Sequence, residues 1–409
     1  MEHVVVVGAG LGGLRTVESL RRAGFPGQIS LVGDEPHEPY DRPPLSKQIL
    51  AGQWPEERAA LHHGDLADLD VSLHLGRPAI GVDGTAVKLA DGERLRYDAL
   101  VVATGVLPRR LPGQPDHPEL HVLRTLEDCR GLRDSLSRAR SLLVIGAGFI
   151  GAEVAATARI AGLDVTMIEA LPVPFARVLG EQMGRLCARL HTDHGVTVRC
   201  GVRLEDFPDA DRNGGIAARL ADGSILRADC GVVGVGTVVD GGWLAGLGVS
   251  TEGGLRCDST GLVEGTTNVY AVGDVAAWQH PTVGDRRRIE HWTSATEQAA
   301  VVAQRIAGAE ITRQADVVPY FWSDQYGLTL QLIGRCDLAT SVEVLHDPGT
   351  IKGTVAGYFQ AGNLAPPGRR AAPLPVPAAS GVPTAAAAPS ALQLGGQVAP
   401  GGGVRPADP

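Results

Sequence analysis

One local pattern occurs twice in this chain of 409 residues, and it restricts the fold more than any other feature. An apolar run, a glycine-rich turn and an amphipathic stretch follow one another at Val4–Ala23 and again at Leu142–Ala161. A second apolar run follows each repeat, at Ile29–Val32 and at Val165–Ile168. The order strand, helix, strand is typical of a parallel sheet covered by helices. The sequence therefore predicts an α/β protein with two Rossmann-like dinucleotide-binding domains.

Two further apolar runs indicate how these domains share the chain. Tyr97–Thr104 precedes the second repeat, and Asn268–Val272 follows it. Both have the composition of a buried strand, so we expect them to join the first sheet, with the second domain inserted between them. The first domain is predicted at residues 1–108 and 240–316, and the second at residues 109–239.

The composition changes after residue 316. Leu328–Ile333 and Ser341–Leu345 alternate apolar and polar residues, which predicts antiparallel strands of a small C-terminal α+β domain at residues 317–364. Residues 365–409 are rich in Pro, Ala and Gly and hold too few large apolar side chains for a core. We predict that this tail is disordered and that the third domain is truncated.

Charge and hydropathy exclude several classes of function. Acidic side chains outnumber basic ones by 46 to 37, which gives a formal net charge of −9 at pH 7. Nonspecific binding to nucleic acid or to an anionic membrane is therefore not expected. We expect no signal peptide, because Met1 and Glu2 lead directly into the predicted strand Val4–Val7, and no apolar run approaches the ~20 residues that a membrane helix needs. We expect a cytoplasmic protein.

The cysteines offer neither a redox motif nor a metal motif. They are Cys129, Cys187, Cys200, Cys230, Cys257 and Cys336. No two have the spacing of a CxxC pair. His191 and His194 lie near Cys187 in sequence, but this charged stretch lacks a fourth ligand for a tetrahedral metal. We expect buried, unreactive thiols and no metal site.

The first glycine turn has the features of a phosphate-binding loop. Its glycines are Gly8, Gly10, Gly12 and Gly13. They lie between a predicted strand and a predicted helix, so the backbone can approach a pyrophosphate at the helix N-terminus. Asp34 and Glu35 follow the next strand, where a carboxylate can accept hydrogen bonds from ribose hydroxyls. The alternative is a glycine turn that binds nothing.

The second glycine turn predicts a nicotinamide cofactor. Gly146, Gly148 and Gly151 repeat the fingerprint, and Glu169 ends the following strand. An acidic side chain there accepts bonds from both ribose hydroxyls and repels a 2′-phosphate, and no arginine follows closely to bind one. The sequence therefore favours NADH over NADPH.

A strand that ends in Val272-Gly273-Asp274 favours FAD as the nucleotide of the first domain. An aspartate at this position can hold a ribityl chain. The alternative is a helix cap, because Asp274 precedes Val275-Ala276-Ala277.

Several longer strings are more specific than a nucleotide fingerprint. They are Gly33–His37, Pro39–Lys47, Leu123–Asp128, Gly148–Glu153, Glu290–Trp292 and Pro319–Gly327. Through them the chain resembles, from about Val4 to Leu364, the NADH-dependent, FAD-containing ferredoxin reductases of bacterial oxygenase systems, of the putidaredoxin, rhodocoxin and biphenyl-dioxygenase reductase type. Relatives continue the third domain with a further strand and helices, whereas here the resemblance stops near Leu364.

The resemblance implies roles for individual residues. Contacts with FAD are implied for Gly12, Asp34, Arg42, Lys47, Arg124, Asp274 and Trp292. We add Ala79 and Thr104 to the predicted cofactor-binding residues. Lys47 and Trp322 would lie near the isoalloxazine and Glu153 near the nicotinamide, which makes these three the predicted catalytic residues. The alternatives are a solvated lysine, a carboxylate on a helix surface and a tryptophan in the core.

The residues that are missing indicate the electron acceptor. Related disulfide reductases and NADH oxidases carry cysteine in the segment where this chain has Pro43–Ser46. Without a thiol the flavin must deliver electrons directly, and it can release them singly. We therefore expect FAD and NADH as cofactors, a ferredoxin with a 2Fe–2S cluster as partner, and an oxygenase downstream.

Other interpretations remain open from the sequence. The chain can instead be an NADH oxidase, a rubredoxin-type reductase, or a non-enzymatic flavoprotein like apoptosis-inducing factor. Arg286–Arg288 is a candidate docking patch for an acidic ferredoxin, and its alternative is a solvated loop.

Overall fold

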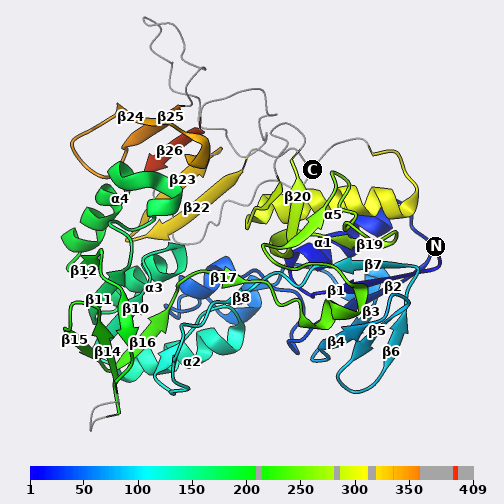
Figure 1. The fold of residues 1–409 in the computed structure, drawn as a ribbon, viewed down its shortest axis with the longest axis horizontal. Coiled ribbons are helices and arrows are strands. Elements are labelled where there is room, and N and C mark those ends of the chain that lie inside the picture. The colour runs from blue at the N-terminus through cyan, green and yellow to red at the C-terminus, as the bar shows by residue number, and fades with distance from the viewer. Residues whose placement is uncertain (209–213, 281–285, 312–318, 335, 360–389, 395–409) are drawn as a thin grey trace, which may run out of the picture. The chain divides into compact units, whose positions relative to one another are not determined.

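The computed structural model of the protein describes residues 1–208, 214–280, 286–311, 319–334, 336–359 and 390–394 (Figure 1). Internal contacts divide the chain into two compact units. The first unit consists of Met1–Arg42, Pro55–Leu107 and Thr237–Pro319, and the second of Pro43–Trp54, Pro108–Gly236 and Tyr320–Pro409. Each unit is built on its own parallel sheet.

The first unit contains a five-stranded parallel sheet in the order β19-β7-β1-β2-β3. These strands are β1 (His3–Val7), β2 (Gln28–Val32), β3 (Ser72–His74), β7 (Ala99–Val102) and β19 (Val269–Ala271). Val4–Val7 is buried along its whole length, as expected for a strand covered on both faces. Helix α1 (Leu11–Arg22) connects β1 to β2, and α5 (Trp292–Ala307) packs beside α1. The predicted pairing of strands from before and after the second repeat is confirmed.

Two smaller sheets complete the first unit. One is antiparallel and contains β4 (Ala79–Val82), β5 (Ala86–Leu89) and β6 (Arg94–Arg96). The other contains β18 (Leu255–Cys257), β20 (Ala276–Gln279) and β21 (Arg286–Arg288). Short 3₁₀ helices also occur in this unit: η2 (Glu56–Ala59), η3 (Leu66–Leu69), η4 (Gly242–Leu247) and η5 (Gly273–Val275).

The second unit repeats the architecture, with a parallel sheet in the order β12-β11-β10-β16-β9. These strands are β9 (Leu120–His121), β10 (Ser141–Ile145), β11 (Asp164–Glu169), β12 (Thr197–Cys200) and β16 (Cys230–Val233). Its helices are η1 (Pro43–Ser46), α2 (Leu126–Arg138), α3 (Phe149–Ile160) and α4 (Ala176–Asp193). An antiparallel sheet adds β13 (Leu204–Asp206), β14 (Ile216–Leu220) and β15 (Ile225–Ala228). Two short strands, β8 (Leu107–Pro108) and β17 (Thr237–Val238), lie where the chain passes between units.

A third sheet, entirely antiparallel, also belongs to the second unit. In the order β22-β23-β26-β25-β24, its strands are β22 (Tyr320–Gln325), β23 (Leu328–Ile333), β26 (Ser390–Leu394), β25 (Val355–Phe359) and β24 (Ser341–His346), with η6 (Cys336–Leu338) before β24. It packs on α3 and α4 through a core that includes Leu179, Met183, Leu330 and Leu332. The predicted antiparallel strands at residues 317–364 are thereby confirmed.

Strand β26 corrects the prediction for the tail. Residues 390–394 were expected to be disordered, but their backbone pairs with β23 on one side and β25 on the other. Without them both neighbours would leave a row of backbone groups unpaired inside the sheet. The C-terminal sheet therefore includes one strand from beyond Leu364. The rest of the predicted tail, residues 365–389 and 395–409, lies outside the described residues.

The compact units differ from the predicted domains in two respects. The C-terminal sheet, predicted as a separate domain at residues 317–364, falls in the second unit, and one further segment changes unit. Pro43–Trp54 packs with the second unit, whereas the prediction had residues 1–108 in one piece. A hydrogen bond from Thr157 Oγ1 on α3 to the carbonyl oxygen of Ser46 (2.9 Å) helps to hold this segment. The division into FAD-binding and NAD-binding domains stays a prediction.

Candidate active site

The first glycine turn fits a bound pyrophosphate. Gly8 has a φ of +115°, and a Cβ there would lie 2.2 Å from the carbonyl oxygen of Ala103. Gly10 is the N-cap of α1 and provides no side-chain cap, so the first amides of the helix face outward from an open turn. Free helix N-terminal amides attract an anion. The turn is therefore shaped to accept a phosphate rather than a side chain.

Two predicted residues beside this turn fit a nucleotide. Thr104 Oγ1 is buried and has no hydrogen-bond partner in the described part of the chain. Thr104 directly follows Ala103, whose carbonyl oxygen lies against Gly8. A buried hydroxyl without a partner is rare, which points to a polar group of a ligand. Asp34 lies just beyond β2 with an exposed side chain, where it accepts a hydrogen bond from the amide of Glu35 (3.0 Å).

Glu35 and Arg42 are brought together by the fold. One oxygen of Glu35 accepts a hydrogen bond from the Tyr40 hydroxyl (2.5 Å), and the other lies 2.9 Å from Arg42 Nη2. Both carboxylate oxygens of Glu35 are thus engaged within the protein. Asp34 is the exposed one of the two acids and is therefore the more accessible to a ribose.

The remaining predicted FAD residues of the first unit lie on different elements. Asp274 is in η5, directly after β19, and strand β20 follows it, so the alternative that Asp274 caps a helix is wrong. Trp292 begins α5, and its Nε1 donates a hydrogen bond to Asp41 (3.2 Å). Arg15 lies over the Trp292 ring at 5.8 Å from its centroid. Ala79 begins β4, in a separate sheet from the glycine turn.

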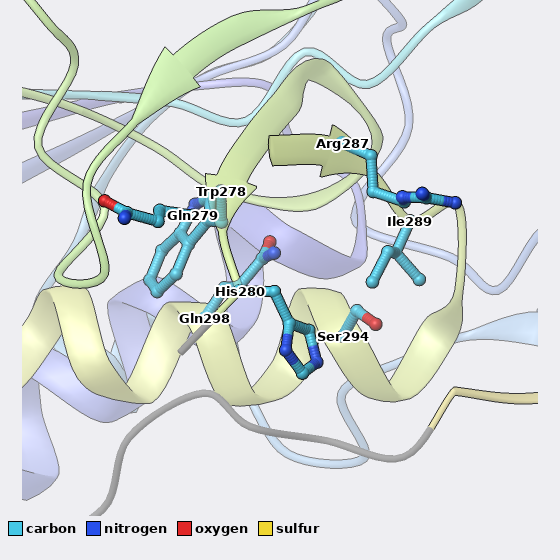
Figure 2. A pocket seen from close by; sticks show the side chains of 7 residues that line it. All are labelled: Trp278, Gln279, His280, Arg287, Ile289, Ser294 and Gln298. Carbon is cyan, nitrogen blue, oxygen red and sulfur yellow. The ribbon is translucent and has the colours of Figure 1, made fainter. Parts of the chain in front are cut away.

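A small pocket opens beside η5 (Figure 2). It is lined by Trp278, Gln279, His280, Arg287, Ile289, Ser294 and Gln298. Gln298 links the pocket to the predicted FAD residues, because its Oε1 accepts a hydrogen bond from the amide of Gly273 (2.8 Å). None of the predicted site residues lines the pocket.

The second glycine turn repeats the geometry of the first. Gly146 has a φ of +101°, and a Cβ there would lie 2.3 Å from the carbonyl oxygen of Gly234. Gly148 is the N-cap of α3, again without a side-chain cap. Glu169 ends β11 and accepts hydrogen bonds from the amides of Ala147 (2.8 Å) and Leu171 (2.9 Å). The carboxylate predicted to bind a ribose is therefore held beside the turn.

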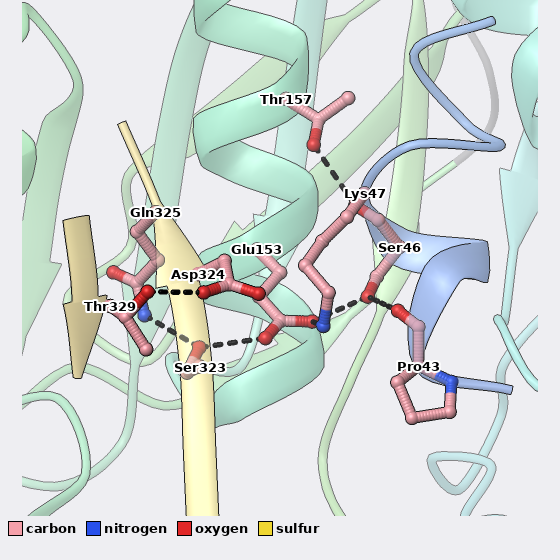
Figure 3. Close-up of polar contacts among 9 residues, drawn as sticks. All are labelled: Pro43, Ser46, Lys47, Glu153, Thr157, Ser323, Asp324, Gln325 and Thr329. Carbon is pink, nitrogen blue, oxygen red and sulfur yellow. Dashed lines mark hydrogen bonds and ion pairs between the residues drawn. The ribbon is translucent and has the colours of Figure 1, made fainter. Parts of the chain in front are cut away.

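Lys47 and Glu153, predicted to be catalytic, form a buried ion pair (Figure 3). Lys47 Nζ lies 3.1 Å from Glu153 Oε2, and the two side chains are 10% and 4% exposed. The alternatives of a solvated lysine and a surface carboxylate are therefore wrong. Burying a charge costs free energy unless the charge is paired and hydrogen-bonded. Lys47 and Glu153 therefore depend on each other within the folded unit.

Three polar contacts around Glu153 were not predicted from the sequence. Ser46 donates to Glu153 Oε2, Ser323 Oγ donates to Oε1 (2.7 Å), and Gln325 Nε2 donates to Ser323 Oγ (3.0 Å). Both serines lie within strings that carry the family resemblance. Residues at i and i+2 of a strand lie on the same face, so Ser323 and Gln325 share one buried face of β22. This alternation was the sequence signal that could have indicated their burial.

Trp322, the third predicted catalytic residue, is not brought to this pair. Neighbouring residues of a strand point to opposite faces of the sheet, so Trp322 and Ser323 diverge. The ring of Trp322 stacks on that of Tyr320, with 5.9 Å between centroids. The role of Trp322 beside a flavin stays a prediction.

Arg124 lies at the start of α2, in the second unit. Thr125 and Asp128 form a capping box there, and the amide of Arg124 donates to Asp128 Oδ2 (2.9 Å). The cap fixes where the helix begins and so fixes the backbone of Arg124. Its contact with FAD stays a prediction.

The cysteines have no redox partner. All six are free thiols, and four are buried, whereas Cys200 and Cys336 are half-buried and so correct the expectation that all are buried. Burial raises the pKa of Cys200 to about 11 and that of Cys187 to about 12. Protonated thiols are poor nucleophiles at neutral pH.

Arg286–Arg288 is a strand rather than the solvated loop considered from the sequence. Arg286 forms an ion pair with Glu264, and Arg288 Nη1 lies 2.8 Å from Glu290. Arg288 also donates to the carbonyl oxygen of Asp274 (2.9 Å). The guanidinium groups of Arg286 and Arg288 therefore have partners within their own unit, which weakens the docking interpretation.

Two further kinds of feature are absent from the described ranges. There, no group of three or more His, Cys, Asp or Glu side chains is arranged to hold a metal ion. Nor does any helix in those ranges have the length and apolar character needed to span a membrane.

His191 is predicted to make stability depend on pH. The imidazole is fully buried on α4, Nδ1 lies 2.8 Å from the Tyr326 hydroxyl, and burial lowers the pKa of His191 to about 4. Below about pH 6.5 the His191 imidazole therefore binds a proton in the unfolded chain, whereas the same imidazole stays neutral in the folded chain. Stability should fall by about 2 kcal/mol between pH 7 and pH 5 and stop falling through this group below pH 4.

Urea unfolding of the wild type and His191→Gln at pH 7 and pH 5 measures this effect. The glutamine side chain does not titrate, so the variant should lose about 2 kcal/mol less than the wild type over this range. Equal losses in the two proteins would show that His191 is not the titrating group.

Comparison with known proteins defines the class of this protein. The model of the family described as pyridine nucleotide-disulphide oxidoreductase matches residues 2–299, and the chain belongs to this family. The chain is thus an oxidoreductase, and the resemblance seen in its motifs is confirmed.

Within the family, the chain is similar to reductases of oxygenase systems. It is 38% identical to rhodocoxin reductase of Rhodococcus erythropolis over 336 residues, which cover 81% of this chain and 78% of that protein. It is 37% identical to the ferredoxin–NAD(+) reductase component of the p-cumate 2,3-dioxygenase system of Pseudomonas putida, covering 82% and 81%. Putidaredoxin reductase, crystallised as a covalent complex with putidaredoxin, matches with a TM-score of 0.82 and 32% identity, covering 88% and 87%.

Proposed function

We propose that the chain is an FAD-dependent NADH:ferredoxin oxidoreductase, which passes electrons from NADH to a 2Fe–2S ferredoxin that serves an oxygenase. The observation that carries this proposal is the occurrence of two glycine turns of the same geometry, one in each compact unit. Each is shaped for a phosphate at a helix N-terminus. Two such turns in one chain support two dinucleotides.

On the basis of these residues, we assign one cofactor to each turn. In the first unit, Gly8–Gly13, Asp34 and Thr104 would hold the FAD phosphates and ribose. In the second unit, Gly146–Gly151 and Glu169 would hold NADH, since the carboxylate repels a 2′-phosphate. When bound, FAD accepts the hydride of NADH and can release the two electrons one at a time.

The protein supplies position and charge rather than acid–base chemistry. Lys47 brings an ammonium group, and Glu153 sets where that group lies. A cation held near the isoalloxazine would stabilise the negative charge that develops there. In the segment Pro43–Ser46 no thiol is present to relay electrons, which supports direct delivery to an external one-electron acceptor.

The names of the relatives support the acceptor. The Pseudomonas putida relative is a ferredoxin–NAD(+) reductase component, and the solved relative was crystallised with putidaredoxin. An iron–sulfur ferredoxin is therefore the partner we propose for this chain.

An anaerobic experiment tests the function. Purified protein is mixed with NADH, with NADPH in a parallel sample, and the flavin absorbance is followed before and after a 2Fe–2S ferredoxin is added. We expect rapid bleaching by NADH, slow bleaching by NADPH, and reoxidation by the ferredoxin. A colourless protein that takes up no FAD would refute the proposal, and reoxidation only by oxygen would indicate an oxidase.

A further inference from the structure

The carboxylate of Glu153 receives hydrogen bonds from two separate parts of the second unit. The segment after Arg42 provides Lys47 and Ser46, which both contact Oε2. Strand β22 of the C-terminal sheet provides Ser323, whose Oγ lies 2.7 Å from Oε1 (Figure 3). Each carboxylate oxygen is thus held from a different side.

Ser323 is itself held by a second residue of β22. A serine hydroxyl has one proton, and here it is donated to Glu153, so the oxygen is left to accept. Gln325 Nε2 donates to that oxygen at 3.0 Å, two residues along the same buried face of the strand. Neither Ser323 nor Gln325 has more than 3% of its surface exposed. Water therefore does not replace these contacts.

The direction of the hydrogen bonds matters for the ion pair. All three groups that contact the carboxylate are donors, as an ionised Glu153 requires. If Ser323 were absent, Oε1 would be a buried anionic atom without a partner, and the carboxylate would gain by rotating to share the remaining donors. Ser323 therefore fixes the orientation in which one oxygen of the Glu153 carboxylate faces Lys47 while the other is held by β22.

From this geometry we infer that Ser323 and Gln325 are positioning residues for the Lys47–Glu153 pair, so that the C-terminal sheet is part of the reductase site. The inference rests on the proposed function for its effect on hydride transfer. The energetic coupling between Ser323 and Lys47 is independent of that function, since the two residues are linked through the hydrogen bonds of Glu153.

The first measurement is a double-mutant cycle in the holoenzyme. Unfolding by urea is compared for the wild type, Ser323→Ala, Lys47→Met and the double variant. If Ser323 orients Glu153 toward Lys47, the loss in folding equilibrium constant caused by Ser323→Ala should differ at least fivefold between the wild-type background and the Lys47→Met background. Additive effects would overturn the inference, whether or not NADH reduces the protein.

The second measurement is anaerobic stopped-flow reduction by NADH. In Ser323→Ala the limiting rate of flavin reduction should fall about tenfold, the loss expected for one charge-assisted hydrogen bond, while the Kd for NADH changes less than about twofold. Ser323→Thr keeps the hydroxyl and should recover most of the rate. Equal rates in Ser323→Ala and the wild type would contradict the positioning role.

Thr329→Val is the matched control. Thr329 Oγ1 donates to Asp324 Oδ1 (2.7 Å) on the opposite face of β22, so the variant loses a hydrogen bond in the same sheet without touching Glu153. It should show neither the slower reduction nor the coupling to Lys47. If it slows reduction as much as Ser323→Ala does, the effect belongs to the stability of the sheet and the inference is wrong. A wild type that shows the coupling but is not reduced by NADH would instead refute the proposed function alone.

Discussion

Lys47→Met is expected to destabilise the protein by about 3 kcal/mol, and Glu153→Gln in the same chain is expected to recover most of that loss. The single variant leaves Glu153 as a buried carboxylate without a counter-ion, and only 4% of its side chain is exposed. The double variant replaces two charges by neutral groups of similar size, which removes the cost of burying an unpaired charge. The pair thus contributes little net stability, although breaking it is costly.

Urea unfolding at pH 7 of the two single variants and the double variant measures this difference. Arg185→Met is the control, because Arg185 and Glu181 form an exposed pair on α4 in the same unit, with side chains 65% and 61% exposed. An exposed pair contributes less than about 1 kcal/mol, so this variant should stay close to the wild type. If the loss in free energy of unfolding in the double variant equalled the sum of the losses in the two single variants, Lys47 and Glu153 would not act as a buried pair.

The parallel sheets could be predicted from the sequence because of how they are buried. A strand covered on both faces reads as an uninterrupted apolar run, and Val4–Val7 and Leu142–Ile145 do so. The turns that follow need a backbone conformation that glycine adopts without strain, so the glycines appear in the sequence at fixed spacing. Local pattern and global fold agree at these positions.

The surroundings of Glu153 could not be predicted in the same way. Ser46 and Ser323 lie 107 and 170 residues from Glu153 in sequence. Serine is common in turns and strands, and nothing in its immediate neighbours indicates a distant carboxylate. Only the topology, which packs both η1 and β22 against α3, makes the contacts.

Strand β26 escaped prediction for a different reason. Composition averaged over a long Pro- and Ala-rich segment hides a run of five residues, Ser390–Leu394, that can pair. The strand pairs through its backbone N–H and C=O groups, and every residue except proline has both groups. The side chains therefore give little indication of the pairing. The position of β26 between β23 and β25 is defined only once the sheet has folded.

Alanine at the two turns is expected to separate the two cofactors. In Gly8→Ala the new Cβ would lie 2.2 Å from a backbone oxygen, so the turn must open and FAD content should fall from about one per chain to below a tenth. In Gly146→Ala the clash, at 2.3 Å, lies in the other unit. That variant should stay yellow but weaken NADH binding by about 100-fold, the equivalent of roughly 3 kcal/mol.

Two further glycines distinguish the clash from backbone strain alone. Gly92 and Gly162 also have positive φ, +93° and +95°, but a Cβ at either position would have no heavy atom within 4 Å. Gly92→Ala and Gly162→Ala should therefore keep FAD and NADH binding even where they lower stability. FAD content is measured from absorbance after heat release, and NADH binding from anaerobic titration, with dithionite reduction showing that the Gly146→Ala flavin is intact. If Gly8→Ala bound FAD as the wild type does, the first turn would not be the flavin site, and the assignment of one dinucleotide to each unit would fail.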